Sequence, residues 1–450
     1  RFGDLRGSFT FSPGWSEGET LVTSSNGEVD RLTNIEFLEF TDGVFTLQEV
    51  LASSVPSEGN DFVNGTDGDD TIDTLAGDDV INALAGDDIL IGGDGADELR
   101  GGEGSDTASY RTSIGGTTAR LDAFGDLNTS HAAGDTYDSI ENLEGSNFGD
   151  LLVGNDDNNI LTGGVGADAL FGMGGIDTAS YHTSAVGVTA RLDGMENLNT
   201  GDATGDIYDS IENLTGSQFN DLLVGDGNDN VISGLAGGDF LFGFDGNDTL
   251  IGGVGPDAFF GGAGRDTADY SASLNGGVRV ALDGSQPGAN DSAGDSFNGV
   301  EDVNGTRSVD FIIGDAGGNI LRGLDGDDTI FSQDGADVLF GGQGADMLNG
   351  GLGSDVFFYS AANEGGDTIM DFDATDDSEV LFFSGLQTGS FSFLGDASNA
   401  FTAGGNTEAR FDDATKQLEV DFDGDGASDF ELTLTDVALS NLDSGDFTFI

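Results

Sequence analysis

Apolar residues recur every nine positions through the middle of the chain. From Gly65, five nonamers follow one another without a gap: GTDGDDTID, TLAGDDVIN, ALAGDDILI, GGDGADELR and GGEGSDTAS. The eighth position of each nonamer is apolar, at Ile72, Ile81, Leu90, Leu99 and Ala108. Three residues centred on that position are enough for a short strand with one inward side chain. The six residues before it are rich in Gly and Asp, which favour tight turns.

The same frame returns in three further runs, so that nonamers occupy 65–109, 145–180, 216–269 and 305–358. A longer repeat lies over the short one. It begins with DTASYRTS at Asp106, DTASYHTS at Asp177 and DTADYSAS at Asp266, at offsets of 71 and then 89 residues. These offsets differ by two nonamers, which predicts a solenoid whose coil contains two nonamers.

Interruptions of about 26 residues separate the runs, at 110–135, 181–206 and 270–295. Each contains an alternating stretch, TTARLD, VTARLD or VRVALD, which is typical of a strand. We expect enlarged coils or side loops on one continuous roll rather than separate domains.

The two ends lack glycine nonamers. Residues 1–60 contain FTFSPGW and IEFLEFTDGVFTL, and 359–450 contain VLFF, SFSFL, ARFDD, LEVDFD and FELTL. These alternations predict strands, and solenoids need terminal caps to cover their last coil. We therefore predict an all-β protein with a β-rich N-terminal segment or cap (1–60), a β-roll (61–358) and a β-rich C-terminal cap (359–450).

The charge balance limits the partners. The chain carries 84 Asp and Glu against 13 Lys and Arg, for a net charge of -71. Nucleic acid and anionic membranes require a basic face, so neither is an expected partner. There is no cysteine and no apolar run of 18 residues, so we expect neither disulfides nor membrane insertion. A divalent cation is the natural counter-ion, since hard cations take carboxylate oxygens.

Aspartate at position six supplies the chemistry. In a coil of two nonamers, residues 18 apart stack at roughly 4.8 Å, and stacked carboxylates repel unless a cation lies between them. Calcium takes 6–8 oxygens and suits such a turn, whereas magnesium demands a small octahedron. The candidate ligands are Asp70, Asp79, Asp88, Asp97, Asp106, Asp150, Asp168, Asp177, Asp221, Asp239, Asp248, Asp257, Asp266, Asp310, Asp328, Asp337, Asp346 and Asp355.

These nonamers, from Gly65 to Phe358, resemble the RTX (hemolysin-type) calcium-binding repeats. The resemblance implies a right-handed parallel β-roll in which the first six residues of each nonamer bind calcium between coils. Asn159, Asn230 and Asn319 replace the position-six Asp, so weaker or absent sites are expected there.

The C-terminal region is similar to that of the serralysin-type secreted proteins, in SDVFFYSAANEGGDTIMDFDATDD (354–377) and DDATKQLEVDFDGDGASDFELTL (412–434). Proteins with such ends leave the cell by type I secretion through an uncleaved C-terminal signal. Residues 446–450, DFTFI, resemble the ending of that signal, although a plain terminal strand also explains them.

The segment from Asp421 to Asp429 resembles the start of an EF-hand calcium loop. Leu432 stands where the bidentate Glu of that loop belongs. A hairpin turn between LEVDF and FELTL explains its Asp-Gly pairs equally well.

Catalysis is not expected. Zinc proteases need an H-E-x-x-H helix, yet His131 and His182 are the only histidines, and we expect both to be exposed in loops. The function that follows is a secreted, non-catalytic calcium-binding protein at the cell exterior or bacterial surface. It would fold on extracellular calcium and serve a structural, surface-layer, matrix or adhesive role, with self-assembly or a cell-surface partner. The alternative is the RTX part of a larger secreted hydrolase or toxin whose active domain precedes Arg1.

Overall fold

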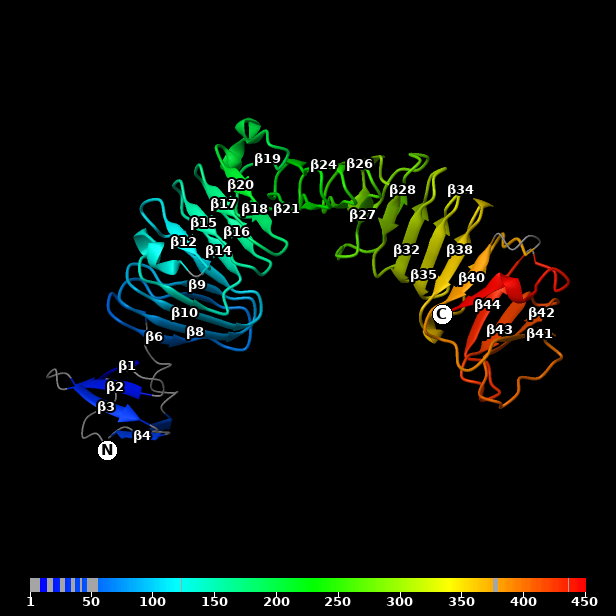
Figure 1. Ribbon diagram of the computed structural model, residues 1–450, viewed down its shortest axis with the longest axis horizontal. Coiled ribbons are helices and arrows are strands. Elements are labelled where there is room, and N and C mark those ends of the chain that lie inside the picture. Colours follow the sequence, from blue (N-terminus) through cyan, green and yellow to red (C-terminus); the bar gives the residue numbers. More distant parts are fainter. Residues whose placement is uncertain are drawn as a thin grey trace. The chain divides into compact units, whose positions relative to one another are not determined.

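The computed structural model describes residues 56–450 except 123, 375–378 and 436. Of residues 1–55 it describes the backbone of five strands. The chain divides into two compact units, Arg1–Thr215 and Gly216–Ile450, and each is described by itself (Figure 1).

The first unit opens with two antiparallel sheets. Three of their five strands lie in FTFSPGW and IEFLEFTDGVFTL, where alternating residues predicted strands. Their strands are β1 (Phe9–Pro13), β2 (Glu19–Ser24), β3 (Val29–Thr33), β4 (Phe37–Phe40) and β5 (Gly43–Thr46). β1 pairs with β2, β2 with β3, and β4 with β5.

The rest of the first unit is a parallel roll. One sheet contains β6 (Phe62–Asn64), β8 (Val80–Ala85), β10 (Glu98–Glu103) and β13 (Thr136–Asp138). A second contains β7 (Thr71–Asp73), β9 (Ile89–Ile91), β11 (Thr107–Ser109), β14 (Asn142–Glu144), β16 (Ile160–Thr162), β18 (Thr178–Ser180) and β21 (Asn213–Thr215). A third contains β12 (Thr118–Arg120), β15 (Leu151–Val153), β17 (Ala169–Phe171) and β20 (Ile207–Asp209). β19 spans Thr189–Arg191.

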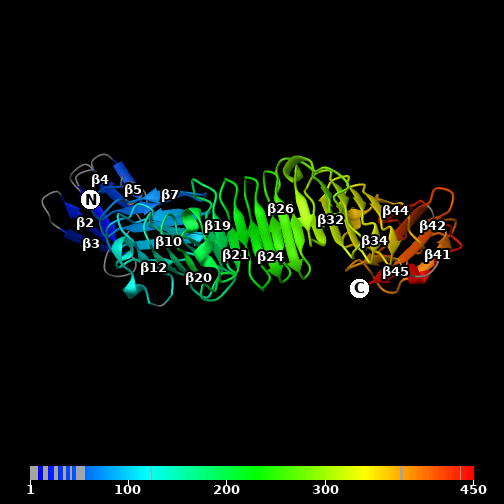
Figure 2. The same cartoon turned by 90° about the horizontal axis from the view of Figure 1, so that it is seen from above.

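The second unit continues the same construction, with strands stacked as successive rungs (Figure 2). One sheet contains β22 (Leu222–Val224), β24 (Phe240–Asp245), β26 (Ala258–Ala263) and β29 (Ser296–Asn298). Another contains β23 (Val231–Ser233), β25 (Thr249–Ile251), β27 (Thr267–Asp269), β30 (Asp302–Asn304), β32 (Ile320–Asp325), β35 (Val338–Gln343), β38 (Val356–Tyr359), β40 (Val380–Phe383) and β45 (Phe447–Phe449). A short pair contains β34 (Asp334–Gly335) and β37 (Leu352–Gly353).

A third sheet joins the roll to the C-terminal region. Its order is β28 (Arg279–Ala281), β31 (Phe311–Ile313), β33 (Thr329–Phe331), β36 (Met347–Asn349), β39 (Thr368–Ile369), β44 (Phe430–Leu434), β43 (Gln417–Asp421), β42 (Glu408–Asp412) and β41 (Ser392–Asp396). The strands β42, β43 and β44 pair antiparallel. The terminal DFTFI segment supplies β45, which lies parallel to β40.

The register confirms a coil of two nonamers. Ile72 pairs with Leu90 and Ile81 with Leu99, each 18 residues further on. These position-eight side chains are buried as predicted. The protein is therefore an all-β parallel β-roll. Among the described residues, no helix has the length and apolar character needed to cross a membrane.

The interruptions enlarge single coils. Across the first one, Ala108 pairs directly with Leu143. The inserted residues contain short 3₁₀ turns, at η2 (Gly125–Leu127), η3 (Ser130–Ala132), η4 (Glu196–Leu198), η5 (Gly201–Ala203) and η6 (Asn290–Ser292). Two more lie near the C-terminus, η7 (Ala362–Glu364) and η8 (Ser444–Asp446).

Candidate metal centre

The position-six aspartates form ladders along the turns. A carboxylate oxygen of each accepts the backbone N–H of the position-six residue one coil earlier. The Asp79 amide donates to Asp97 Oδ1 at 2.8 Å, and the Asp88 amide donates to Asp106 Oδ1 at 2.9 Å. The stacking expected from the 18-residue offset is therefore present, with each rung fixed to the next.

The second carboxylate oxygen of most rungs has no partner. Fourteen of the eighteen predicted ligands have a buried Oδ2 atom without a hydrogen bond to any described residue. They are Asp79, Asp88, Asp97, Asp106, Asp168, Asp177, Asp239, Asp248, Asp257, Asp266, Asp328, Asp337, Asp346 and Asp355. An unsatisfied buried acceptor costs about 1–3 kcal/mol, and more when it is charged. A repeated cost of this size indicates that a cation belongs beside these oxygens.

Glycine at position one lies close to Oδ2 in most of these rungs. A Cβ atom on Gly92 would lie 2.2 Å from Asp97 Oδ2, and one on Gly243 would lie 2.1 Å from Asp248 Oδ2. Thr74, Ala83 and Ser332 stand at this position in three rungs, so glycine is common there without being required. The unpartnered oxygens fit calcium, which coordinates oxygen in flexible geometry.

Burial also raises the pKa of these carboxyl groups, so that without a metal they ionise less readily. Desolvation, with repulsion from Asp79 and Asp135, raises the pKa of Asp97 to about 8. Desolvation likewise raises the pKa of Asp168 to about 8 and that of Asp239 to about 7. A nearby cation would offset this cost, because it favours the ionised form.

Four predicted ligands lie in turns that the chain closes by itself: Asp70, Asp150, Asp221 and Asp310. In each, Oδ2 accepts the amide of a Ser or Thr at position two. The Ser146 amide reaches Asp150 Oδ2 at 2.6 Å, and the Ser146 hydroxyl also donates to the carboxylate. These carboxylates open each run and have no vacant oxygen of the kind found at the other fourteen.

Asparagine closes the turns where the sequence led us to expect weak sites. The side-chain amide of Asn159 donates to the Glu141 carbonyl at 2.7 Å, and that of Asn319 donates to the Glu301 carbonyl at 2.7 Å. In each of these turns a carbonyl oxygen already accepts a side-chain N–H, and the position-six carboxylate is missing. Both differences leave fewer oxygen atoms for a cation. This geometry supports the expectation without testing it.

Sequence reasoning missed the rungs supplied by the enlarged coils. Asp97, Asp168 and Asp257 donate their amides to Asp135, Asp206 and Asp295, 38 residues further on, each at 2.8 Å. The recurring G-D-x-[YF] before SIEN or GVED was the available signal. The nine-residue phase does not reach it, because the insertion breaks the count.

In each of these added rungs, a tyrosine hydroxyl donates a hydrogen bond to the second carboxylate oxygen. Tyr110 donates to Asp135 Oδ2 at 2.9 Å, and Tyr181 donates to Asp206 Oδ2 at 2.8 Å. Tyr270 donates to Asp295 Oδ2 at 2.6 Å. These three ladders therefore end in a turn closed by tyrosine. The fourth, which begins at Asp310, ends at Asp367, whose Oδ2 has no hydrogen bond to any described residue.

The second enlarged coil predicts a contrast between two tyrosines. Tyr181→Phe leaves Asp206 Oδ2 buried without its donor, so we expect a loss of about 1–3 kcal/mol in the free energy of unfolding. Among the described residues, the Tyr208 hydroxyl forms hydrogen bonds only with the Tyr181 hydroxyl and the Asn199 side-chain amide, and the third copy carries Phe297 at its position. Tyr208→Phe should therefore cost clearly less. Urea unfolding at saturating calcium measures both, and equal losses would contradict this role for Tyr181.

The two histidines differ from each other. His182 is exposed, as expected, and lies 3.0 Å from the Ser180 hydroxyl. The expectation for His131 was wrong, because its side chain is only 12% exposed and its Nε2 lies 3.1 Å from Asp94 Oδ1. Packing of the first enlarged coil against the turn at Asp94 buries it.

One pentapeptide weakens the case against catalysis. Residues 14–18 read G-W-S-E-G, the G-x-S-x-G pattern of a nucleophile elbow, and they lie outside the described residues.

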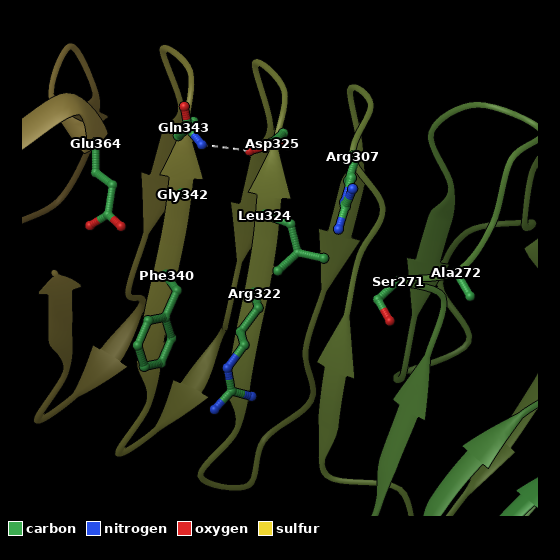
Figure 3. Close-up of a pocket in the computed structure, with 10 residues that line it drawn as sticks. All are labelled: Ser271, Ala272, Arg307, Arg322, Leu324, Asp325, Phe340, Gly342, Gln343 and Glu364. Carbon is green, nitrogen blue, oxygen red and sulfur yellow. Dashed lines mark hydrogen bonds between the residues drawn. The ribbon is translucent and has the colours of Figure 1, made fainter. Parts of the chain in front are cut away.

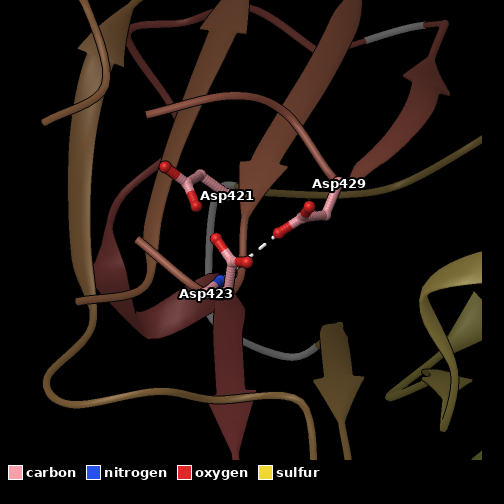
Figure 4. Close-up of side chains that lie close together, drawn as sticks. All are labelled: Asp421, Asp423 and Asp429. Carbon is pink, nitrogen blue, oxygen red and sulfur yellow. Dashed lines mark hydrogen bonds between the residues drawn. The ribbon is translucent and has the colours of Figure 1, made fainter. Parts of the chain in front are cut away.

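The Asp421 segment forms the hairpin turn between β43 and β44 (Figure 4). Carboxylate oxygens of Asp421, Asp423 and Asp429 lie within 4.8 Å of one another. Both oxygens of Asp421 accept backbone amides, from Gly424 at 2.7 Å and Gly426 at 2.8 Å. The hairpin interpretation is confirmed, and the turn holds together through its own hydrogen bonds.

Comparison with known proteins agrees with this geometry. The model of a family described as RTX calcium-binding nonapeptide repeat (4 copies) matches residues 57–90, 73–108, 144–179, 208–241, 242–272, 296–330, 304–338, 322–357 and 331–369. No curated protein matches the chain.

Among solved structures, the chain is similar to the extracellular lipase LipA of Serratia marcescens. The identity is 20% and the TM-score 0.24, over 51% of this chain and 40% of the lipase. The chain thus spans less than half of that protein, and this likeness carries no argument about activity. The repeat model, by contrast, matches about half of the chain. The chain belongs to the family of RTX calcium-binding nonapeptide repeat proteins.

Proposed function

We propose that this chain is a secreted, non-catalytic protein whose β-roll folds when it binds calcium outside the cell. The observation that carries the proposal is the series of buried, unpartnered Oδ2 atoms. Without a cation these groups oppose folding, and with calcium they become ligands, so binding energy becomes folding energy. Extracellular calcium modules typically bind at about 10⁻⁴–10⁻³ M, which would leave the chain unfolded in the cytosol.

We assign the ions to the fourteen turns with a vacant Oδ2 and not to the four turns closed by Ser or Thr. Hydrogen bonding supports this division, because the Oδ2 atoms of the four closed turns already accept Ser or Thr amides. The C-terminal segment would direct type I secretion, as its resemblance implies. In the folded roll this segment is strand β45, so it would be free to act only before folding.

For the mature protein we propose a structural, surface-layer, matrix or adhesive role. Its test is sedimentation velocity and electron microscopy of the chain with millimolar calcium and with chelator. Ordered assembly in calcium alone is the expected result. Hydrolysis of a simple ester by the calcium-loaded chain, abolished by Ser16→Ala, would overturn the non-catalytic part of the proposal.

The raised pKa values predict how pH acts on this switch. Burial lifts the pKa of Asp106 to about 6, of Asp248 to about 7 and of Asp328 to about 8, against an ordinary value near 3.9. The folded metal-free roll therefore binds protons more tightly than the unfolded chain. Its stability is greatest below about pH 4 and is lost as pH rises through 6 to 8.

Two measurements follow from this sign. Circular dichroism of metal-free chain should gain β signal as pH falls from 8 to 4. The calcium concentration at half-folding should fall as pH falls from 8 to 6, because protonation of these carboxyl groups also stabilises the folded chain. A midpoint independent of pH would contradict the raised pKa values of the ladder carboxylates.

A further inference from the structure

Among the described residues of the second unit, three arginines form no ion pair with an acidic side chain. Most cationic side chains of the described residues do have one, in the pairs Arg100–Glu98, Arg111–Glu144, Arg120–Asp122, Arg191–Asp193, Arg265–Asp302, Arg410–Glu419 and Lys416–Asp413. Within the described part of the chain, Arg279, Arg307 and Arg322 form no such pair. Asp302 and Asp269 favour the charged form of Arg322 from a distance, but they form no ion pair with it. In a chain with 84 acidic residues against 13 basic ones, an arginine without an ion pair requires an explanation.

Two of these arginines, Arg307 and Arg322, line the same cavity of about 810 Å³ (Figure 3). Arg322 projects from β32 and Phe340 from the neighbouring strand β35. The Arg322 guanidinium carbon lies 4.8 Å from the centroid of the Phe340 ring, and Phe340 packs on Phe358 at 4.6 Å. Arg322 is thus held by stacking, with one weak hydrogen bond to Asn304 at 3.3 Å.

The acidic residues around the cavity are engaged elsewhere. Asp325 Oδ1 accepts the side-chain amide of Gln343 at 3.0 Å. The Glu364 carboxylate accepts the Ser360 amide at 2.6 Å and the Ser360 hydroxyl at 2.9 Å. They neutralise neither guanidinium group, yet each keeps lone pairs for further donors.

Both arginines of the cavity are specific to the third copy of the long repeat. Where that copy carries Arg307, the first two carry Asn147 and Gln218. Where it carries Arg322, they carry Thr162 and Ser233. The roll therefore folds without arginine at either position, so the two guanidinium groups are not needed for the coil itself.

We infer that this cavity binds a sugar acid, a ligand with one carboxylate and several hydroxyl groups. Arginine's planar fork of donors matches a carboxylate. Asp325, Gln343 and Glu364 supply acceptors for hydroxyl groups, and Leu324 supplies an apolar wall. A polyanion fits poorly, because its further charges would face Asp325 and Glu364. The size lies within the range of small-molecule sites, about 300–1,000 Å³.

The test is isothermal titration of the calcium-saturated full chain with galacturonate, with galactose and sulfate as comparison ligands and calcium buffer as blank. We expect galacturonate to bind at least about tenfold more tightly than galactose, since the neutral sugar leaves both guanidinium groups unpaired. Arg307→Gln installs the residue of the second copy and should weaken galacturonate binding about tenfold. Arg322→Ser, also a second-copy residue, should weaken it at least as much.

Arg100→Gln is the matched control, because it removes the same charge from a pair with Glu98 elsewhere on the chain. It should leave galacturonate affinity unchanged. The calcium midpoint of every variant is measured in parallel, so that a failure to fold is distinguished from a loss of the site. Absence of galacturonate binding by the folded chain, equal binding of galactose, binding of sulfate alone, or an unaltered affinity in folded Arg307→Gln would each overturn the inference.

Discussion

Chelation of calcium is expected to convert the β-rich circular dichroism spectrum of this chain into that of an unfolded chain. The cause is electrostatic. The Oδ2 atoms of fourteen predicted ligands, and that of Asp367, are buried without a partner among the described residues, and the chain carries a net charge of -71. Because each coil contacts its neighbours, the transition should be cooperative along the roll. Far-UV circular dichroism during a calcium titration of metal-free chain, near neutral pH, measures it.

Magnesium is the control for this titration. It prefers a small octahedral site and releases its water reluctantly, so it should not restore the β spectrum at the same concentration. Recovery with magnesium equal to that with calcium would mean that simple charge screening suffices. A spectrum indifferent to chelator would remove the folding switch altogether.

Asp88→Ala is expected to raise the calcium concentration at half-folding several-fold and to remove bound calcium. Asp88 Oδ1 holds the Asp70 amide at 2.7 Å, and its Oδ2 is one of the vacant oxygens. The substitution therefore breaks the tie to the coil before it and deletes a ligand. The lost hydrogen bond alone leaves a buried donor unpaired, at a cost of about 1–3 kcal/mol. Calcium titration and metal analysis of the purified variant report the two effects.

Two substitutions calibrate that result. Asp67→Ala removes an exposed negative charge from the third position of a nonamer and should leave both the midpoint and the ion count unchanged. Asp70→Ala removes a carboxylate that is already bonded to the Thr66 amide and hydroxyl. It should cost stability without changing the ion count. If Asp70→Ala releases as much calcium as Asp88→Ala, the division into open and closed turns is wrong.

The repeat could be read from the sequence because its period is strict. An 18-residue coil follows from two nonamers, and it correctly placed Asp79 beside Asp97 and Leu90 against Ile72. The burial of position eight followed from the same count. Local periodicity determines these contacts, since each coil packs only on its neighbours.

The closure of individual turns could not be predicted in the same way. Whether a carboxylate is open depends on position two, where Ser146 donates two hydrogen bonds to Asp150 but Gly164 offers no side chain to Asp168. The tyrosine closures depend on contacts 25 residues apart, as between Tyr110 and Asp135, inside a coil whose length the nonamer does not fix. Burial of His131 depends on the packing of the same coil.

The closed turns have a consequence for how such a chain can grow. On one side of the roll, two ladders begin at a Ser-closed rung and end at a Tyr-closed one, from Asp150 to Asp206 and from Asp221 to Asp295. The first and last rungs of such a segment have no vacant carboxylate oxygen. Adding or deleting the whole segment therefore leaves no incomplete ion site at either junction. Duplication can then lengthen the protein by whole segments. The number of bound ions rises with the number of added coils.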